Sequence, residues 1–90
     1  MNEPAIESVL STRGSMRLYG FTQTHERLIV ECHQDGLRRF IHFVLVERIS
    51  APVSWSTKSP TVERHGDRLH YRDDGVEIVC AEMMANDRPN

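Results

Sequence analysis

Residues 27–49 read RLIVECHQDGLRRFIHFVLVERI, and the Asp35-Gly36 pair inside this stretch decides the fold. Asp-Gly between two β-rich runs is a strong hairpin signal, because a type I′ turn needs positive φ at both central positions. A two-residue loop also sets the register of the two strands. That register places one mostly apolar set of residues on a common face: Cys32 opposite Arg39, Val30 opposite Ile41, and Leu28 opposite Phe43.

A second pair of the same kind, Asp74-Gly75, lies between residues 68–73 and 76–84. The same turn chemistry predicts a second antiparallel hairpin. Its register joins opposite charges on one face and apolar groups on the other, which cross-strand energetics favour. The facing pairs are Arg72 with Glu77, Tyr71 with Ile78, and Leu69 with Cys80.

Further strand signals extend the two hairpins into one antiparallel meander. Apolar runs bounded by turn residues predict about six strands, which is near the usual size of a sheet. A mainly β sheet of this size is expected to curl into a half-barrel or a small barrel, with Gly20 as a bulge. The predicted strands are residues 15–22, 27–34, 37–49, 61–64, 68–73 and 76–84.

The segments outside these strands leave alternatives open. Residues 50–60 contain two prolines and several Ser and Thr, so they form a loop or an interrupted edge strand. Residues 4–12 fit either a short helix that begins at Pro4 or an irregular or strand-like segment, and we favour the helix. The chain, residues 1–90, is expected to be a single domain with flexible tails at 1–3 and 86–90.

Charge and apolar content exclude several classes of function. The net charge is −2, and acids such as Glu31 interrupt the basic residues, which argues against a nucleic-acid or anionic-membrane partner. The longest apolar run, residues 40–46, is too short to cross a bilayer. Cys32 and Cys80 lie within apolar strand patterns, which indicates reduced core thiols. With no signal-peptide pattern at the N-terminus, we predict a cytoplasmic protein.

The strand that contains residues 40–46 is apolar on both faces. Phe40, His42 and Val44 point to the second face, where the neighbouring strand adds Ile29 and Glu31. One face of an antiparallel sheet is commonly exposed to water, so this second face needs a cover. The N-terminal segment, a second copy of the chain in a homodimer, or a ligand or partner protein would each supply one.

Two of these residues are candidates for chemistry. His42 lies diagonally across from Glu31, which suggests either an acid–base pair in a cleft or a buried histidine satisfied by a carboxylate. No nucleophile elbow or phosphate-binding loop is present in the sequence. Cys32 and His33 are adjacent in a strand and point to opposite faces. We therefore predict no metal site and no cofactor, because metal sites need convergent ligands.

Trp55 is the third candidate, and it lies in the polar segment 52–57. Tryptophan is a frequent hot-spot residue at protein interfaces, so an exposed Trp55 would bind a partner. The alternative is that Trp55 folds back as a lid over an open end of the sheet.

These observations favour a small non-enzymatic protein-interaction module of the inhibitor, immunity or adaptor type, which self-associates as a dimer. Such proteins act through surface shape and carry no catalytic motif. The alternative is a small-ligand-binding half-barrel or a minor enzyme. It would use His42 and Glu31 in a pocket lined by Phe40, Val44 and Ile29.

Overall fold

The computed structural model describes residues 3–22 and 26–89. These residues form one helix followed by nine strands. The helix confirms the interpretation that we favoured for residues 4–12, although it already begins at Glu3. The bounds are α1 Glu3–Ser11, β1 Ser15–Phe21, β2 Arg27–Gln34, β3 Leu37–Val44, β4 Arg48–Ser50, β5 Ser54–Ser56, β6 Thr61–His65, β7 Arg68–Asp73, β8 Val76–Cys80 and β9 Glu82–Asn86.

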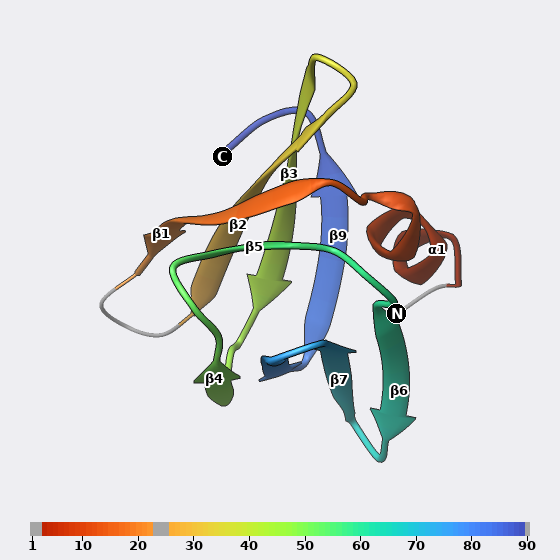
Figure 1. Cartoon of the computed structure of the whole chain (residues 1–90). Coiled ribbons are helices and arrows are strands. Elements are labelled where there is room, and N and C mark those ends of the chain that lie inside the picture. Colours follow the sequence, from red (N-terminus) through yellow and green to blue (C-terminus); the bar gives the residue numbers. More distant parts are fainter. Residues whose placement is uncertain (1–2, 23–25, 90) are drawn as a thin grey trace.

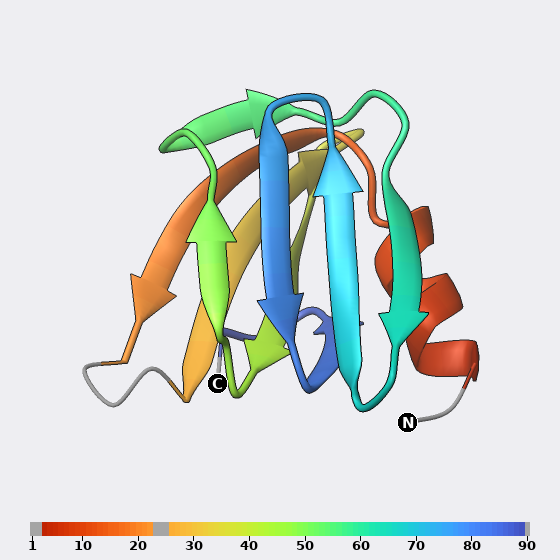
Figure 2. The same cartoon turned by 90° about the horizontal axis from the view of Figure 1, so that it is seen from below.

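The strands form two antiparallel sheets that face each other (Figures 1 and 2). One sheet has the order β5-β1-β2-β3-β9 and the other has the order β4-β8-β7-β6. The mainly β, antiparallel meander is confirmed, but the described strands number nine and not about six, and they lie in two sheets and not in one. The described strands do not close into a barrel either, since each sheet keeps two edge strands.

The single sheet was wrong because two predicted long strands bend and pass from one sheet to the other. The strand predicted at 37–49 breaks after Val44, where Leu45 has a φ of 56°, and continues as β4. The strand predicted at 76–84 breaks at Ala81 between β8 and β9. Hydrogen bonds continue through the bend: the Glu47 N–H donates to the Val79 carbonyl at 2.8 Å and the Ala81 N–H to the Val44 carbonyl at 3.0 Å. Both halves of each strand can therefore face one core.

Both Asp-Gly hairpins have the predicted registers. Asp35 and Gly36 have φ values of 51° and 79°, as a type I′ turn requires. In the second turn positive φ is found at Gly75 but not at Asp74, so the predicted turn type is wrong there although the register is right. The bulge is confirmed, because the register of β1 against β2 shifts between Leu18 and Gly20.

The core fills the space between the two sheets. The edge of the Phe43 ring packs against the Tyr71 ring across the sheets, with 5.4 Å between the ring centroids. Cys32 and Cys80 are buried free thiols, and burial raises the pKa of Cys80 to about 12. The fully enclosed residues of this core are Val9, Met16, Leu28, Val30, Cys32, Ile41, Phe43, Leu69, Tyr71, Ile78, Cys80 and Met83.

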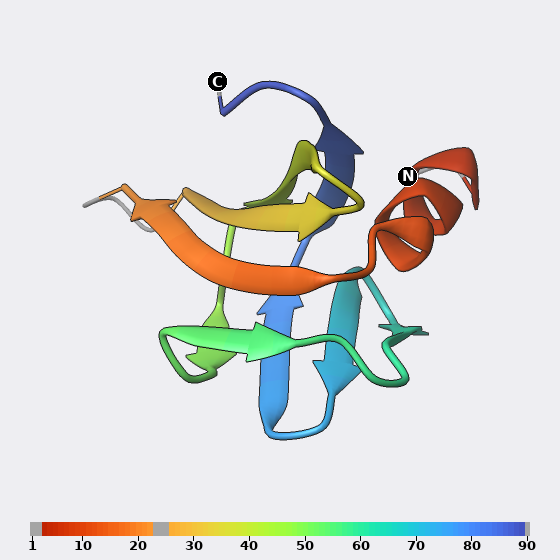
Figure 3. The same cartoon turned by 45° about the horizontal axis from the view of Figure 1, so that its top comes forward.

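The helix α1 closes one open side of this core. It packs on β9 and β6 (Figure 3). Its Val9 side chain is completely buried in the core. The N-terminal segment therefore does not cover the second face of strand 40–46, and the alternative that it does so is wrong. In the same view the chain beyond β9 turns back toward β3, and this segment lies over that face instead. Asn86, where we expected a tail to begin, is the last residue of β9.

Candidate binding site on the outer face of the five-stranded sheet

The outer face of the four-stranded sheet carries ion pairs between exposed arginines and carboxylates. Glu77 Oε2 lies 3.2 Å from Arg72 Nη2, and Glu77 Oε1 lies 3.7 Å from Arg48 Nε. At the rim of the same sheet Arg68 Nε lies 2.6 Å from Glu47 Oε2. Exposed pairs of this kind contribute little energy and are typical of a solvated surface. The outer face of the five-stranded sheet is different.

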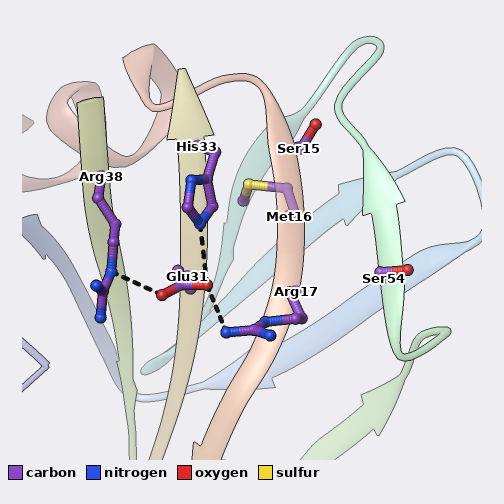
Figure 4. Close-up of a pocket in the computed structure, with 7 residues that line it drawn as sticks. All are labelled: Ser15, Met16, Arg17, Glu31, His33, Arg38 and Ser54. Carbon is purple, nitrogen blue, oxygen red and sulfur yellow. Dashed lines mark hydrogen bonds and ion pairs between the residues drawn. The ribbon is translucent and has the colours of Figure 1, made fainter. Parts of the chain in front are cut away.

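Glu31 organises a cluster of charged side chains on the central strand of the five-stranded sheet (Figure 4). Its Oε1 atom lies 2.7 Å from Arg17 Nη2 and 3.1 Å from His33 Nε2, and its Oε2 atom lies 2.7 Å from Arg38 Nε. We call these four residues the Glu31 cluster. The register explains it: Arg17 on β1 is directly opposite Glu31, His33 is two residues further along β2, and Arg38 on β3 is opposite His33.

The cluster is buried at its anion and exposed at its cations. Only 3% of the Glu31 side chain is exposed, against 59% for Arg17 and 52% for Arg38. Burial alone would raise the pKa of Glu31. The hydrogen bond with His33 and the charges of the two arginines outweigh it and hold this pKa below its usual value of 4.5. A buried carboxylate therefore fixes two guanidinium groups that remain open to a ligand.

An aromatic pair adjoins the Glu31 cluster. Phe40 lies opposite Glu31 in the ladder of β2 and β3 and is only 2% exposed. The ring of Tyr19 packs edge-on against it, with 5.2 Å between the ring centroids, and Arg38 Cζ lies 5.1 Å from the centroid of the Phe40 ring. Tyr19 itself remains 44% exposed. Tyr19 and Arg38 thus cover Phe40 and offer an aromatic and a cationic surface side by side.

The structure does not bring His42 and Glu31 together as an acid–base pair. His42 is buried, and its Nε2 atom lies 3.1 Å from Asn86 Oδ1 and 2.8 Å from the carbonyl oxygen of Arg88. Glu31 is occupied by its own cluster. Asn86 at the end of β9 and Arg88 after it are therefore the partners of His42 Nε2, and the geometry matches the buried-histidine interpretation with different partners from the one predicted.

Three of the other predicted binding residues lie on the outer face of the paired strands β2 and β3, and the fourth lies apart from them on β5. Ile29 and Val44 are half-buried on the outer face, while Phe40 is too enclosed to contact a ligand directly. Trp55 lies in β5 opposite Met16, and its half-buried ring packs against the core, as the lid interpretation expects. Its role in binding stays a prediction. None of these four residues lines the hollow beside Glu31.

An open hollow of about 520 Å³ lies instead beside the Glu31 cluster. Glu31 was predicted as a site residue, but it was paired with the wrong histidine. The spacing of Glu31 and His33 places both on one face of a strand, and this signal was available. No such signal was available for Arg17, because its position opposite Glu31 depends on how β1 pairs with β2 beyond the bulge. The hollow is lined by Ser15, Met16, Arg17, Glu31, His33, Arg38 and Ser54 (Figure 4).

Comparison with protein-family models, with curated proteins and with solved structures finds no match for this chain. Within the described ranges, α1 is too short to be a membrane span. Among those same residues no three His, Cys, Asp or Glu side chains are grouped as metal ligands.

We expect Glu31→Gln to lower the free energy of unfolding at neutral pH by about 1–2 kcal/mol, because a buried carboxylate loses three charge-assisted contacts while the arginines regain water. The folded-state pKa of Glu31 is depressed, so its contribution is complete above pH 4.5 and is lost as the pH falls through the lower folded value. The difference between wild type and Glu31→Gln should therefore shrink in acid.

Urea denaturation at neutral pH and at several values below 4.5 measures this difference. Burial raises the pKa of Asp73, but hydrogen bonds from backbone N–H groups together lower it by more, so the net pKa is below its usual value. Asp73 therefore makes wild type and variant equally sensitive to acid, and its effect cancels when their stabilities are compared. Glu7→Gln, at an exposed position on α1, is the control and should leave the midpoint nearly unchanged. A constant difference between wild type and Glu31→Gln at every pH would contradict the assignment.

Proposed function

We propose that this chain is a non-enzymatic protein-interaction module, of the inhibitor, immunity or adaptor type, that binds an acidic segment of a partner protein. The binding surface is the outer face of the five-stranded sheet around the Glu31 cluster. The observation that carries the proposal is the pair of half-exposed guanidinium groups of Arg17 and Arg38, both held by one buried carboxylate.

Three properties of this surface support protein binding. Arg and Tyr are the residue types that dominate binding energy at interfaces, and here Arg38 and Tyr19 stand next to each other on Phe40. The arginines are fixed before a partner arrives, which reduces the entropy lost on binding. On the opposite outer face Glu77 also lies between two arginines, Arg48 and Arg72, but Glu77 is 29% exposed and its contact with Arg48 is 3.7 Å long, so those arginines are held less firmly.

Two finer expectations accompany this proposal. The buried thiols of Cys32 and Cys80 are consistent with a reducing compartment, and we propose a cytoplasmic location. Self-association as a dimer also stays a proposal. The segment after β9 covers His42, so part of the reason for a second copy on this face is gone. Light scattering measures the oligomeric state directly.

Selection from a displayed library of random peptides tests the proposed function. Peptides that bind the folded chain should be enriched in Asp and Glu. Arg17→Ala and Arg38→Ala should each weaken the binding of a selected peptide about tenfold, which corresponds to ~1.4 kcal/mol. Arg48→Ala removes an arginine of the other sheet whose side chain is 71% exposed and is the control, with an expected change of less than about twofold.

Selected peptides without acidic enrichment would argue against the proposed surface. Equal weakening by Arg48→Ala would show a general charge effect and would also overturn the proposal. Circular dichroism and the urea midpoint of each variant establish that it is folded. The affinity measurement is made at two salt concentrations, since contacts between exposed charges weaken with ionic strength.

A further inference from the structure

We infer that the free N–H groups of the Arg17 and Arg38 guanidinium groups, which flank the buried Glu31 carboxylate, form a subsite for one carboxylate group of the bound segment. The ligand is the side chain of an Asp or Glu residue and not a phosphorylated residue. This inference rests on the proposed function and specifies the chemistry of its central contact.

The subsite has unused hydrogen-bond donors. Arg38 contacts Glu31 through Nε, and its Nη1 and Nη2 atoms have no partner within the described residues. Arg17 contacts Glu31 through Nη2, and its remaining donors have no partner within the same part of the chain. A planar guanidinium edge with two parallel N–H groups matches the two oxygens of a carboxylate. Arg38 therefore offers a bidentate contact and Arg17 a second donor.

The donors are held in place by contacts on several sides. Antiparallel pairing of β1, β2 and β3 fixes the backbone of both arginines on either side of Glu31. The Arg38 guanidinium also lies over the Phe40 ring, which limits its rotation. Ser15 and Ser54 line the same hollow.

Charge decides between a carboxylate and a phosphate. The two guanidinium cations of Arg17 and Arg38 against the one Glu31 carboxylate leave a single net positive charge on these three side chains. One carboxylate brings this local charge to zero. A phosphorylated side chain carries about −1.5 to −2 charges at neutral pH and would leave an excess of negative charge next to the buried Glu31. The cluster is thus matched to a monoanion.

A nuclear magnetic resonance titration of the full chain tests this inference. The probes are sodium acetate, as an isolated carboxylate, and sodium sulfate, as a tetrahedral dianion, at constant ionic strength set with sodium chloride. The readouts are the side-chain Nε–H signals of Arg17 and Arg38. Acetate should produce a saturable shift of both signals, with a dissociation constant about threefold or more below that of sulfate.

Arg38→Lys is the diagnostic variant, because it keeps the positive charge and removes the planar fork. It should weaken acetate binding about threefold or more, while Arg72→Lys on the other sheet should leave it unchanged. Tighter binding of sulfate than acetate, or no saturable shift with acetate, would overturn the inference. So would equal effects of the two lysine variants.

The two proposals fail in different ways. If acetate binds at the cluster but no acidic peptide is selected, the carboxylate subsite stands and the protein-interaction function is overturned. A free small carboxylic acid would then be the ligand. If acidic peptides bind this face but sulfate binds the cluster more tightly than acetate, the function stands and the carboxylate inference is overturned.

Discussion

Gly14→Ala is expected to lower the free energy of unfolding by about 3 kcal/mol or more, through backbone crowding that cannot be relieved locally. A Cβ atom at position 14 would lie 2.2 Å from the carbonyl oxygen of His33, and Gly14 has a φ of +152°, which other residues rarely adopt. Gly14 is also held in place on its other side. Its N–H donates to Thr57 Oγ1 at 2.8 Å, and its carbonyl accepts from the Thr57 N–H at 3.0 Å. Urea denaturation followed by circular dichroism measures the loss.

Two other glycines provide graded controls for this substitution. Gly75 has a φ of 74°, and a Cβ atom added there would meet no neighbouring atom within 4 Å, so Gly75→Ala should cost about 1 kcal/mol from backbone strain alone. Gly20 has neither restriction, and Gly20→Ala should change stability by about 0.5 kcal/mol or less. If Gly14→Ala lowers the free energy of unfolding no more than Gly75→Ala does, the close approach of Gly14 to His33 is not what requires glycine at position 14.

Tyr71→Ala is expected to destabilise the fold by about 3–5 kcal/mol, which is a large part of the stability of a domain this small. Tyr71 is completely buried on β7 of the four-stranded sheet, and its ring packs edge-on against Phe43 from the five-stranded sheet. Removing the ring would leave a cavity at the contact between the two sheets. We expect a large drop in the urea midpoint, or a chain that is unfolded without denaturant.

Tyr71→Phe is the matched control, because it removes only the hydroxyl group. That hydroxyl is buried without a hydrogen-bond partner among the described residues, and burial raises the pKa of Tyr71 well above its usual range. Loss of an unsatisfied buried polar atom should leave stability unchanged or raise it by up to about 1 kcal/mol. A loss of more than about 1 kcal/mol in Tyr71→Phe would show that the hydroxyl has a partner in solution.

The two hairpins were predictable in register because the information for them is local. A two-residue Asp-Gly loop sets the pairing of the strands on either side, and the charges and apolar groups then agree with that pairing. The bends at Leu45 and Ala81 were not predictable in the same way. Leu45 adopts positive φ, which its residue type disfavours, so tertiary packing imposes this conformation. One apolar run therefore contributes strands to both sheets, and the structure has more strands than the six or so that the sequence predicts.

The candidate site shows the same division between local and long-range information. The outward position of Phe40, His42 and Glu31 follows from the register of one hairpin, and it was predicted correctly. Their partners come from other parts of the chain: Arg17 from β1 and Asn86 from the end of β9. No local pattern specifies these contacts. The register of one hairpin made a His42–Glu31 pair a reasonable expectation. In the structure each of these two residues is bound instead by partners from more distant parts of the chain.

The bent strands also have a consequence for the order in which this chain folds. The strands β3 and β4 pair with β9 and β8 along one ladder that passes through both sheets. Neither sheet can be completed alone, because the last strand of the five-stranded sheet continues directly from β8 of the other. Contacts between segments so distant in sequence form slowly. Assembly of the two sheets should therefore be one concerted event, with no stable species in which only one sheet has formed.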